Sequence, residues 1–435
     1  MRIFIDCTHT AKHNYKNTGI HRVVRELTTE LANISQNYQN IEVIDVMFDG
    51  KFITRVTNLH HQNYIHHHKN SLFDWMKNKK FQIFLNKVNN KILNYFSGIL
   101  FWAYWFDLNS DNKFSLLEFE GHKILPGDIY VIADANWDLP KTYYKFLQIL
   151  KKHDVIVAVI CYDIIPMKFP EFCSQKLTKD FNNFYENYSN LFDQVLCISK
   201  NSADDYKNAR SKGIVSNNNP NLIVKSFRLG CDYSSKISRS NLNDKNCNDN
   251  IKRLLTKKYI LVVGSLVPHK NLKSVIEAFD LLVDSTHEQI YLLFAGNKGW
   301  DSKTDHLIES HRMHNNIIHI LGSVTDFELN LLYQNCYCLV QASFYEGFGL
   351  PVVEALQHGK PVISSNGGSL PEIGGDFCIY FNPKEPIELY QALEKLVNSK
   401  TFYNELVTRI RNEYIPFSWE ESAKQLLSLL SIQKN

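Results

Sequence analysis

Residues 343–359 read Ser-Phe-Tyr-Glu-Gly-Phe-Gly-Leu-Pro-Val-Val-Glu-Ala-Leu-Gln-His-Gly, a loop with two glycines that leads into an apolar run. An expected strand ends near Gln341, just before this loop. Pro351 suits the first turn of a helix, where no backbone N–H is needed. Gly359 suits the position after the last helical residue, and Pro361 lies beyond it. The segment therefore predicts a strand, a glycine loop and a helix in that order.

The same segment carries groups that suit a nucleotide-sugar. Gly347 and Gly349 lie just before the expected helix, where unpaired backbone N–H groups and the positive end of the helix dipole suit a diphosphate. Glu354 lies about one turn into the helix, where its carboxylate can accept two hydroxyl hydrogen bonds, as from a ribose diol. Glu346 precedes the glycines, where it can accept from sugar hydroxyls. A lone Gly-x-Gly is also typical of a plain tight turn, but the glutamates and both helix ends in register favour a ligand site.

The rest of the chain alternates short apolar strands with helices. In the second half, a turn is expected at Gly264, a helix at Leu272–Leu282, and strands at Tyr259–Val263, Ile290–Ala295, Ile317–Leu321, Cys338–Gln341 and Val362–Ser364. In the first half, a helix is expected at Ile20–Leu31, another helix is capped by Ser199, and strands are expected at Arg2–Ile5, Asp128–Ala133, Val155–Ile160 and Gln194–Ile198. This alternation predicts parallel sheets covered by helices.

The length of 435 residues exceeds one ordinary hydrophobic core and predicts two domains. Residues 234–257, rich in Ser, Asn and Asp in their first part, are expected to link an N-terminal domain at 1–233 to a C-terminal domain at 258–415. The amphipathic helix Trp419–Leu430, within residues 416–435, is expected to pack back on the first domain. The predicted fold class is α/β, with two Rossmann-like, doubly wound domains that face an interdomain cleft.

Composition narrows the classes of function. The net charge of +3 is too small to predict a nucleic-acid partner. The nine cysteines include no Cys-x-x-Cys pair, which indicates free thiols in a reducing compartment. No apolar run reaches the roughly 18 to 20 residues of a membrane span, and the N-terminus does not resemble a signal peptide, so we expect a cytoplasmic protein. The motif region contains no Asp-x-Asp, so we expect neither a metal nor a cofactor.

The segment Tyr345–Ala355 resembles the E-x7-E signature of retaining GT-B glycosyltransferases of family 4, or glycosyltransferase group 1. Its flanks at Gly359–Ser365 and Gly368–Gly375 fit the same family, and Val263–Asn271 resembles the family's donor-phosphate loop. The resemblance is strong over residues 257–430. In the first half it rests on three weaker blocks, Thr18-Gly19-Ile20, Tyr162–Pro166 and Pro170-Glu171.

This resemblance implies a donor-binding set of Gly264, Ser265, Lys270, Val324, Glu346, Gly347, Phe348, Gly349, Leu350 and Glu354. Lys270 and the backbone from Gly347 to Leu350 would bind the donor diphosphate. Glu354 would hold the ribose, and Glu346 would contact the transferred sugar. Val324 would lie near the base.

The resemblance also implies three catalytic residues, Glu346, Lys270 and Asp163. On the acceptor side it implies Gly19, which would let the first helix approach the donor phosphates, and Tyr162. Asp134 follows an expected strand and either binds the acceptor or packs in the domain. Two positions depart from the family. Ser265 stands where an arginine is common, and Tyr162-Asp163 stands where a His-Asp pair is frequent.

The leading hypothesis is a retaining, metal-independent transferase that moves a hexose from a nucleotide diphosphate sugar to a glycan or lipid-linked acceptor in surface polysaccharide synthesis. GDP-mannose is the first choice of donor, because Tyr162–Pro166 and Gly264–Asn271 resemble blocks of mannosyl- and rhamnosyltransferases. Alternatives are a UDP- or dTDP-sugar transferase, a sugar-nucleotide epimerase, against which the E-x7-E context argues, and a catalytically silent GT-B subunit that scaffolds an assembly complex. The silent subunit stays an alternative because Ser265 and Tyr162 depart from the family pattern.

Residues 77–106 combine lysines with apolar residues at helical spacing, followed by an aromatic-rich run. One interpretation is a basic amphipathic patch that touches an anionic membrane or a lipid-linked acceptor, which would place the protein at the inner face of the membrane. The other is a core-packing helix with a solvated basic face. The histidines at 60–68 are more typical of a polar loop than of a metal site, because no carboxylate or cysteine framework accompanies them.

Overall fold

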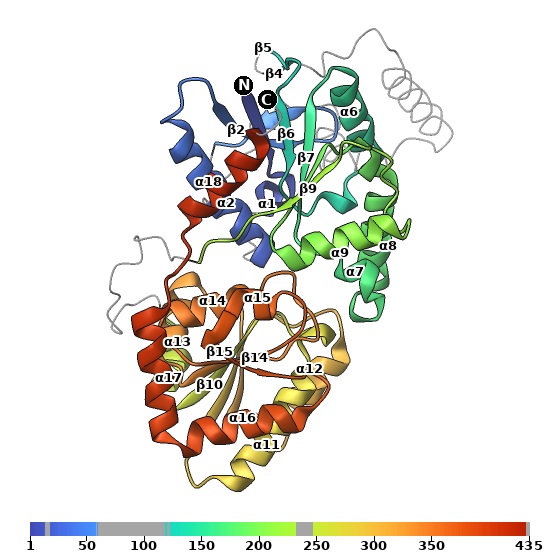
Figure 1. The fold of residues 1–435 in the computed structure, drawn as a ribbon. Helices are drawn as coiled ribbons and strands as arrows, with labels where there is room; N and C mark the ends of the chain where they lie inside the picture. Colours follow the sequence, from blue (N-terminus) through green and yellow to red (C-terminus); the bar gives the residue numbers. More distant parts are fainter. Residues whose placement is uncertain (14–17, 58, 60–117, 120–121, 232–246, 432–435) are drawn as a thin grey trace, which may run out of the picture.

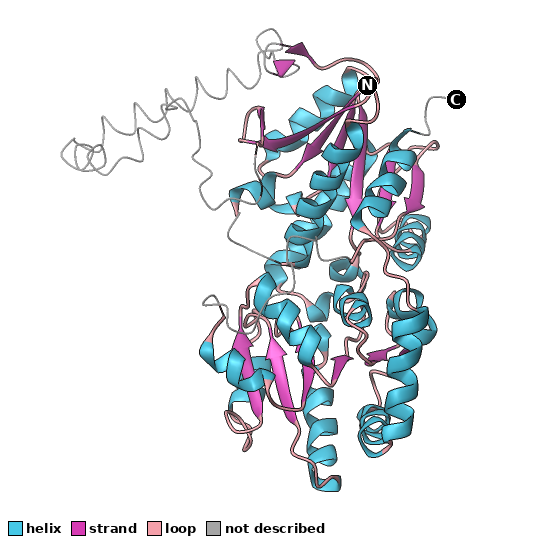
Figure 2. Cartoon of the chain, turned by 90° about the vertical axis from the view of Figure 1, so that its left-hand side faces the viewer, coloured by secondary structure: helices cyan, strands magenta, loops and turns pink. Residues whose placement is uncertain are grey.

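The computed structural model describes residues 1–13, 18–57, 59, 118–119, 122–231 and 247–431. These residues form two α/β domains, one above the other in Figure 1 and again in the turned view of Figure 2. The possible membrane segment at 77–106, the histidines at 60–68 and the first part of the expected linker, 234–246, lie outside the described residues.

The N-terminal domain is built on a seven-stranded sheet of order β3-β2-β1-β6-β7-β8-β9. Its strands are β1 (Arg2–Asp6), β2 (Glu42–Phe48), β3 (Ile53–Arg55), β6 (Ile129–Ile132), β7 (Ile156–Cys161), β8 (Gln194–Cys197) and β9 (Ile223–Ser226). All neighbours pair in parallel except β2 and β3. The chain runs from β1 first to one side and then to the other, which makes the sheet doubly wound. A separate antiparallel pair joins β4 (Glu118–Phe119) to β5 (His122–Lys123).

Helices cover both faces of this sheet (Figure 2). They are α1 (Thr8–Lys12), α2 (Gly19–Ser35), α6 (Lys141–Lys152), α7 (Ile165–Lys168), α8 (Gln175–Tyr188) and α9 (Lys200–Ser211), with short 3-10 turns η1 (Asn136–Asp138), η2 (Pro170–Phe172) and η3 (Ser189–Leu191). The inner strand β6 is apolar along its whole length and fully buried, and β7 is apolar and buried after its first residue, because helices cover both faces.

The C-terminal domain has a six-stranded, wholly parallel sheet of order β12-β11-β10-β13-β14-β15. Its strands are β10 (Tyr259–Val263), β11 (Tyr291–Ala295), β12 (Ile318–Gly322), β13 (Cys338–Gln341), β14 (Val362–Ser365) and β15 (Cys378–Phe381). Its helical segments are α10 (Asp249–Leu255), η4 (Pro268–Lys270), α11 (Leu272–Ser285), α12 (Ser302–Glu309), α13 (Asp326–Asn335), α14 (Leu350–Gln357), α15 (Leu370–Gly374), η5 (Gly375–Phe377), α16 (Pro386–Asn398) and α17 (Lys400–Glu413). The predicted fold class, two doubly wound α/β domains, is confirmed.

The second part of the expected linker is not an open connection. Residues 249–255 form α10, whose start is capped by the Asn248 side chain. The Asn248 backbone N–H also donates to Glu328 Oε1 of α13 at 2.9 Å, and Ile251 and Leu254 are buried in the second domain. The sequence did not predict this helix, because polar residues precede it and it contains only three large apolar residues. The later part of residues 234–257 therefore belongs to the C-terminal domain.

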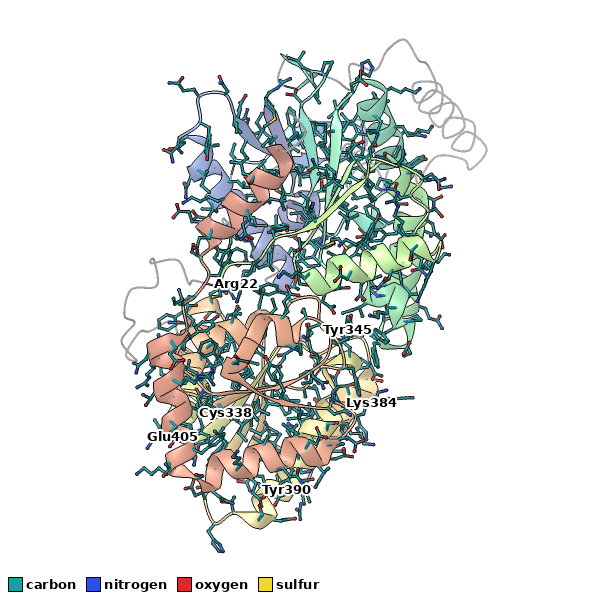
Figure 3. All side chains as sticks on the ribbon, in the orientation of Figure 1. Arg22, Cys338, Tyr345, Lys384, Tyr390 and Glu405 are labelled. Atoms are coloured by element: carbon teal, nitrogen blue, oxygen red, sulfur yellow. The ribbon has the colours of Figure 1, made fainter. Side chains whose placement is uncertain are left out.

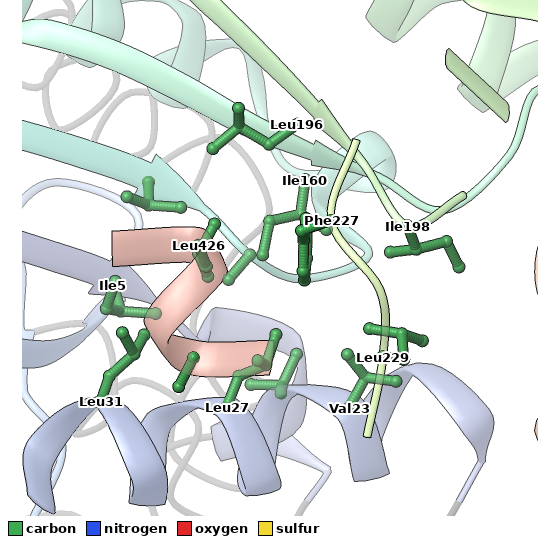
Figure 4. Packing of buried hydrophobic residues seen from close by; sticks show 14 of the residues in the cluster. Ile5, Val23, Leu27, Leu31, Ile160, Leu196, Ile198, Phe227, Leu229 and Leu426 are labelled. Atoms are coloured by element: carbon green, nitrogen blue, oxygen red, sulfur yellow. The ribbon is translucent and has the colours of Figure 1, made fainter. Parts of the chain in front are cut away.

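The last helix of the chain, α18 (Trp419–Ser431), returns to the first domain and lies beside α2 (Figure 1). Figure 4 shows Leu426 of α18 packed between Leu27 and Leu31 of α2 and the strand residues Ile5 and Ile160. The Trp419 backbone also occupies the space where a side chain at Gly230 would lie. Burial of this apolar face fixes both ends of the chain in one domain.

The same apolar cluster extends across the boundary between the domains. Phe348, Val353 and Ile373 of the second domain belong to it, together with Tyr162 of the first. Each of these four side chains is buried. The two domains therefore meet through packed apolar surface as well as through polar contacts.

None of the helices in the described part of the chain is both long and apolar enough to cross a membrane.

We expect Leu426→Ala to destabilise the N-terminal domain by about 2–5 kcal/mol, because it leaves a cavity between α18 and α2. Leu426 is 1% exposed. Lys424→Ala is the matched control on the same helix, since the Lys424 side chain is 56% exposed in a surface ion pair and its loss costs at most about 1 kcal/mol. Urea denaturation followed by circular dichroism measures both. Equal stability of the two variants would contradict the packing described for α18.

Candidate functional site

The glycine loop between β13 and α14 has the predicted form. Gly349 precedes the helix with φ of 103°, in the left-handed region, and Pro351 lies in the first turn. Within the described part of the chain, the backbone N–H groups of Gly347, Phe348 and Gly349 donate no hydrogen bond. Three unpaired N–H groups at a helix N-terminus form an arrangement that suits an anion.

This loop is held from the opposite domain. The Gly347 carbonyl accepts hydrogen bonds from Ser199 Oγ at 2.8 Å and Ser202 Oγ at 3.2 Å. A Cβ atom at Gly347 would overlap the carbonyl oxygen of Tyr162 and lie 2.9 Å from Cβ of Asp163. Only glycine lets the two backbones approach this closely. The loop therefore has its position fixed by the first domain.

Glu346 is the centre of a dense polar group. Its Oε1 atom accepts from Lys270 Nζ at 2.5 Å, Ser343 Oγ at 2.6 Å and Gln341 Nε2 at 2.8 Å. Burial favours the neutral acid, but the Lys270 ammonium and the nearby His269 outweigh it, so the pKa of Glu346 lies below its ordinary value. Glu346 is therefore a carboxylate at neutral pH, paired with the predicted phosphate-binding lysine.

Lys270 comes from the loop after β10. A Cβ atom at Gly264 would lie 3.2 Å from Lys270 Cε, so the lysine stem lies against this glycine. Ser265, where the family has an arginine, is exposed. Burial, with the positive charge of Lys270, lowers the pKa of His269 to about 4. His269 is therefore neutral at pH 7 and does not replace the missing positive charge.

Glu354 is buried, and both of its oxygens already have partners. Oε1 accepts from Arg22 Nη1 of α2 in an ion pair across the domain boundary. Oε2 accepts from the Tyr333 hydroxyl of α13 at 2.6 Å. Sequence reasoning missed both partners. The signal for Arg22 was its position one turn after Gly19 on the same helix, whereas nothing in the sequence marked Tyr333.

Asp163 reaches the site from the first domain. Its Oδ2 would lie 3.2 Å from a Cβ at Gly347, and its Oδ1 accepts from the Ile165 N–H at 2.9 Å. Burial raises the pKa of Asp163 to about 6 against this hydrogen bond, and the charge of Glu346 adds to the rise. The neighbouring Tyr162 is different, because its hydroxyl donates to the Ala133 carbonyl at 2.7 Å and so serves the packing of the first domain.

The remaining predicted residues lie apart from this group. Both oxygens of Asp134 accept from backbone N–H groups, of Thr10 at 2.5 Å and Ala135 at 2.8 Å, so the structure favours its packing interpretation. Gly19 begins α2, with no described atom within 4 Å of a Cβ built there. Val324 lies between β12 and α13, partly buried against the core of the second domain. Leu350 is the first residue of α14.

Further contacts that the sequence did not predict close the domain boundary. The Tyr345 hydroxyl donates to Asp205 Oδ2 at 2.6 Å and accepts from Lys168 Nζ and Asn201 Nδ2, each at 2.8 Å. The Glu372 carboxylate accepts from the first two N–H groups of α9, at 2.9 and 3.0 Å. Figure 3 labels Arg22 and Tyr345, which both lie along this boundary. These contacts join the α14 and α15 side of the second domain to α7 and α9 of the first.

No group of three or more His, Cys, Asp or Glu side chains among the described residues is placed to hold a metal ion.

We expect Gly347→Ala to separate the domains, because the added methyl group overlaps the Tyr162 carbonyl. Small-angle X-ray scattering should show a larger radius of gyration than for the wild-type protein. Gly19→Ala is the matched control, since its methyl group meets no described atom. An unchanged radius for Gly347→Ala would mean that the domains do not meet as described.

Comparisons with known proteins bear on the same residues. The family model described as "Glycosyl transferases group 1" matches residues 245–413. The serotype-specific mannosyltransferase WbdA of Escherichia coli is 26% identical over 315 residues, which cover 70% of this chain and 37% of WbdA. The O-antigen chain mannosyltransferase B of E. coli is 31% identical over 170 residues, or 39% of this chain and 45% of that protein. The matched segments thus cover less than half of the length of either relative, 37% of WbdA and 45% of mannosyltransferase B.

Among solved structures, Anabaena HepE in complex with UDP and glucose superposes with a TM-score of 0.58. The alignment covers 99% of this chain and 100% of HepE at 14% identity, a level that shows a shared fold alone. The match to the family model confirms the resemblance inferred for the second half. The roles given to individual site residues stay predictions. The chain has the GT-B fold, and its residues 245–413 match the glycosyltransferase group 1 family.

Proposed function

We propose that this chain transfers mannose from GDP-mannose to a glycan or lipid-linked acceptor, with retention of configuration and without a metal. The observation that carries the proposal is the pairing of Lys270 with Glu346 beside three backbone N–H groups at the start of α14 that have no partner among the described residues. The loop after β10 thus offers positive charge to a diphosphate, and the adjoining loop before α14 offers a carboxylate to sugar hydroxyls. The group 1 domain and the mannosyltransferase relatives support the transferase class.

In the proposed reaction, the bond between the sugar and the nucleoside diphosphate breaks, which leaves negative charge on the diphosphate and positive character on the sugar. An acceptor hydroxyl oxygen forms the new bond to the same sugar carbon, and its proton passes to the released diphosphate. The α14 N-terminus and Lys270 stabilise the leaving charge. Glu346 holds the lysine in place and accepts from a sugar hydroxyl through its second oxygen. Asp163, from the opposite domain, faces the same loop as an anion that stabilises the cationic sugar. The closed boundary excludes water, which would otherwise hydrolyse the donor.

The choice of mannose rests on the names of the relatives and on two sequence blocks. WbdA and the O-antigen chain mannosyltransferase B both carry mannosyltransferase in their names. Tyr162–Pro166 and Gly264–Asn271 resemble blocks of mannosyl- and rhamnosyltransferases, and both lie at the candidate site. UDP in the HepE complex shows what that protein binds at 14% identity, so it does not decide the base here.

Thermal-shift screening against GDP-, UDP- and dTDP-sugars tests the donor, because a ligand that binds the folded state raises Tm. We expect GDP-mannose to give the largest shift, and mass spectrometry to detect GDP release when glycan acceptors are added. A larger rise in Tm with a UDP- or dTDP-sugar would mean that the donor carries uracil or thymine instead of guanine. No shift and no release with any donor would overturn the proposed activity.

Lys270→Ala should lower kcat/KM by roughly tenfold to a thousandfold, as expected for loss of one charged stabiliser of the leaving group. Lys273→Ala is the control, since the Lys273 side chain is 73% exposed and lies in the first turn of α11. Tm is measured for both, because Lys270 also pairs with the partly buried Glu346. Near-normal kcat/KM for a folded Lys270→Ala protein would remove the lysine from the mechanism.

The activity should also depend on pH through Asp163. Its pKa is raised to about 6, so the carboxylate is protonated below that pH and ionised above it. If the ionised form stabilises the sugar cation, kcat/KM rises as the pH increases through about 6 and then levels off. Asp163→Asn should have low activity that lacks this rise. A rise near pH 6 that survives in Asp163→Asn would assign it to another group, such as Asp134, whose pKa is also raised to about 6.

A further inference from the structure

Arg22 is paired with Glu354, the carboxylate that is expected to hold the ribose of the donor. Its guanidinium pairs with Glu354 Oε1, while Tyr333 holds Oε2. The Glu354 side chain is 3% exposed and that of Arg22 is 14% exposed, so the arginine lies over the carboxylate. A ribose diol therefore cannot reach Glu354 until Arg22 moves away from it.

The charges near the α14 loop show where the displaced arginine can go. The Lys270 ammonium is already balanced by Glu346, and His269 is neutral because its pKa is lowered to about 4. A nucleoside diphosphate brings at least two negative charges to this loop. Arg22 pairs with the fifth residue of the helix that begins there, about 7 Å along its axis at 1.5 Å per residue. That distance lies within the range of movement of a long arginine side chain.

We propose that Arg22 is a donor-binding residue that exchanges partners: it holds Glu354 when the site is empty, and moves to the donor diphosphate when ribose hydroxyls take over Glu354. A planar guanidinium suits both partners, because carboxylates and phosphates each accept paired N–H groups. Since Arg22 belongs to α2 and Glu354 to α14, the exchange also ties donor occupancy to the contact between the domains. This inference rests on the proposed function, since it requires a nucleotide at the α14 loop.

The exchange predicts opposite effects of one substitution on two ligands. In Arg22→Met, guanosine should bind more tightly by a few-fold, because no arginine has to leave Glu354. GDP should bind more weakly, by about tenfold or more, because the diphosphate loses a charge-assisted partner. Calorimetry measures GDP and ligand-observed NMR measures guanosine, with UDP and uridine run in parallel in case the base differs. The diphosphate that binds the wild-type protein defines the pair of ligands that is compared.

Arg2→Met is the matched control. Arg2 pairs with Asp128 within the first domain, and its side chain is 16% exposed against 6% for the aspartate, close to the values for Arg22 and Glu354. Arg2→Met should lower Tm without changing either affinity. Arg22→Lys, a milder change, should keep part of the GDP affinity because it retains the charge, and Tm shows that each variant is folded.

Three outcomes overturn the exchange. If Arg22→Met changes the affinities for nucleoside and nucleoside diphosphate by the same factor, Arg22 has a structural role. If it weakens GDP and leaves guanosine unchanged, Arg22 does not compete for Glu354. If it leaves GDP unchanged, Arg22 does not reach the diphosphate. Failure of the proposed function is a separate result, because neither GDP nor UDP would then bind the wild-type protein.

Discussion

The close approach of Gly347 to the backbone of Tyr162 is the constraint on which the candidate site depends. A single methyl group at Gly347 would overlap the Tyr162 carbonyl, and the Gly347 carbonyl is bonded to Ser199 and Ser202 of the first domain. This contact brings Asp163 over the α14 loop. It also joins the two doubly wound domains at the carboxyl ends of their sheets, where such folds bind ligands.

Charge balance is the second organising feature. Among the described residues, the partly buried Glu346 pairs with Lys270 and the buried Glu354 pairs with Arg22. A buried carboxylate without such a partner would be costly, so these pairs stabilise the site, and a nucleotide that takes over either carboxylate would have to rearrange them. The first pair lies within the second domain, whereas the other joins the two domains. In the proposed exchange, Arg22 couples donor binding to the contact between the domains, and in the proposed reaction Lys270 acts at the α14 loop.

Much of the fold was predictable because parallel strands buried on both faces leave strong apolar runs. β10 and β13 begin and end as predicted. β2 and β15, which have more exposed residues, were not predicted, and α10 was hidden in a polar segment. Within the site, the spacing of residues 346–354 alone predicted the glycine loop and the helix that follows it. Pairs such as Arg22 with Glu354, 332 positions apart, depend on how the domains meet, which no local pattern encodes. Asp134 illustrates the same limit, because its position after a strand did not reveal its backbone partners.

The central claim is that the start of α14 binds the diphosphate of a nucleotide-sugar through unpaired backbone N–H groups. Amide hydrogen exchange with and without GDP-mannose tests this claim at the atoms concerned. The account predicts that the nucleotide slows exchange at Gly347, Phe348 and Gly349, whose N–H groups have no partner in the described part of the empty protein. Protection confined to the first domain, with exchange at these three residues unchanged under saturating nucleotide, would contradict it.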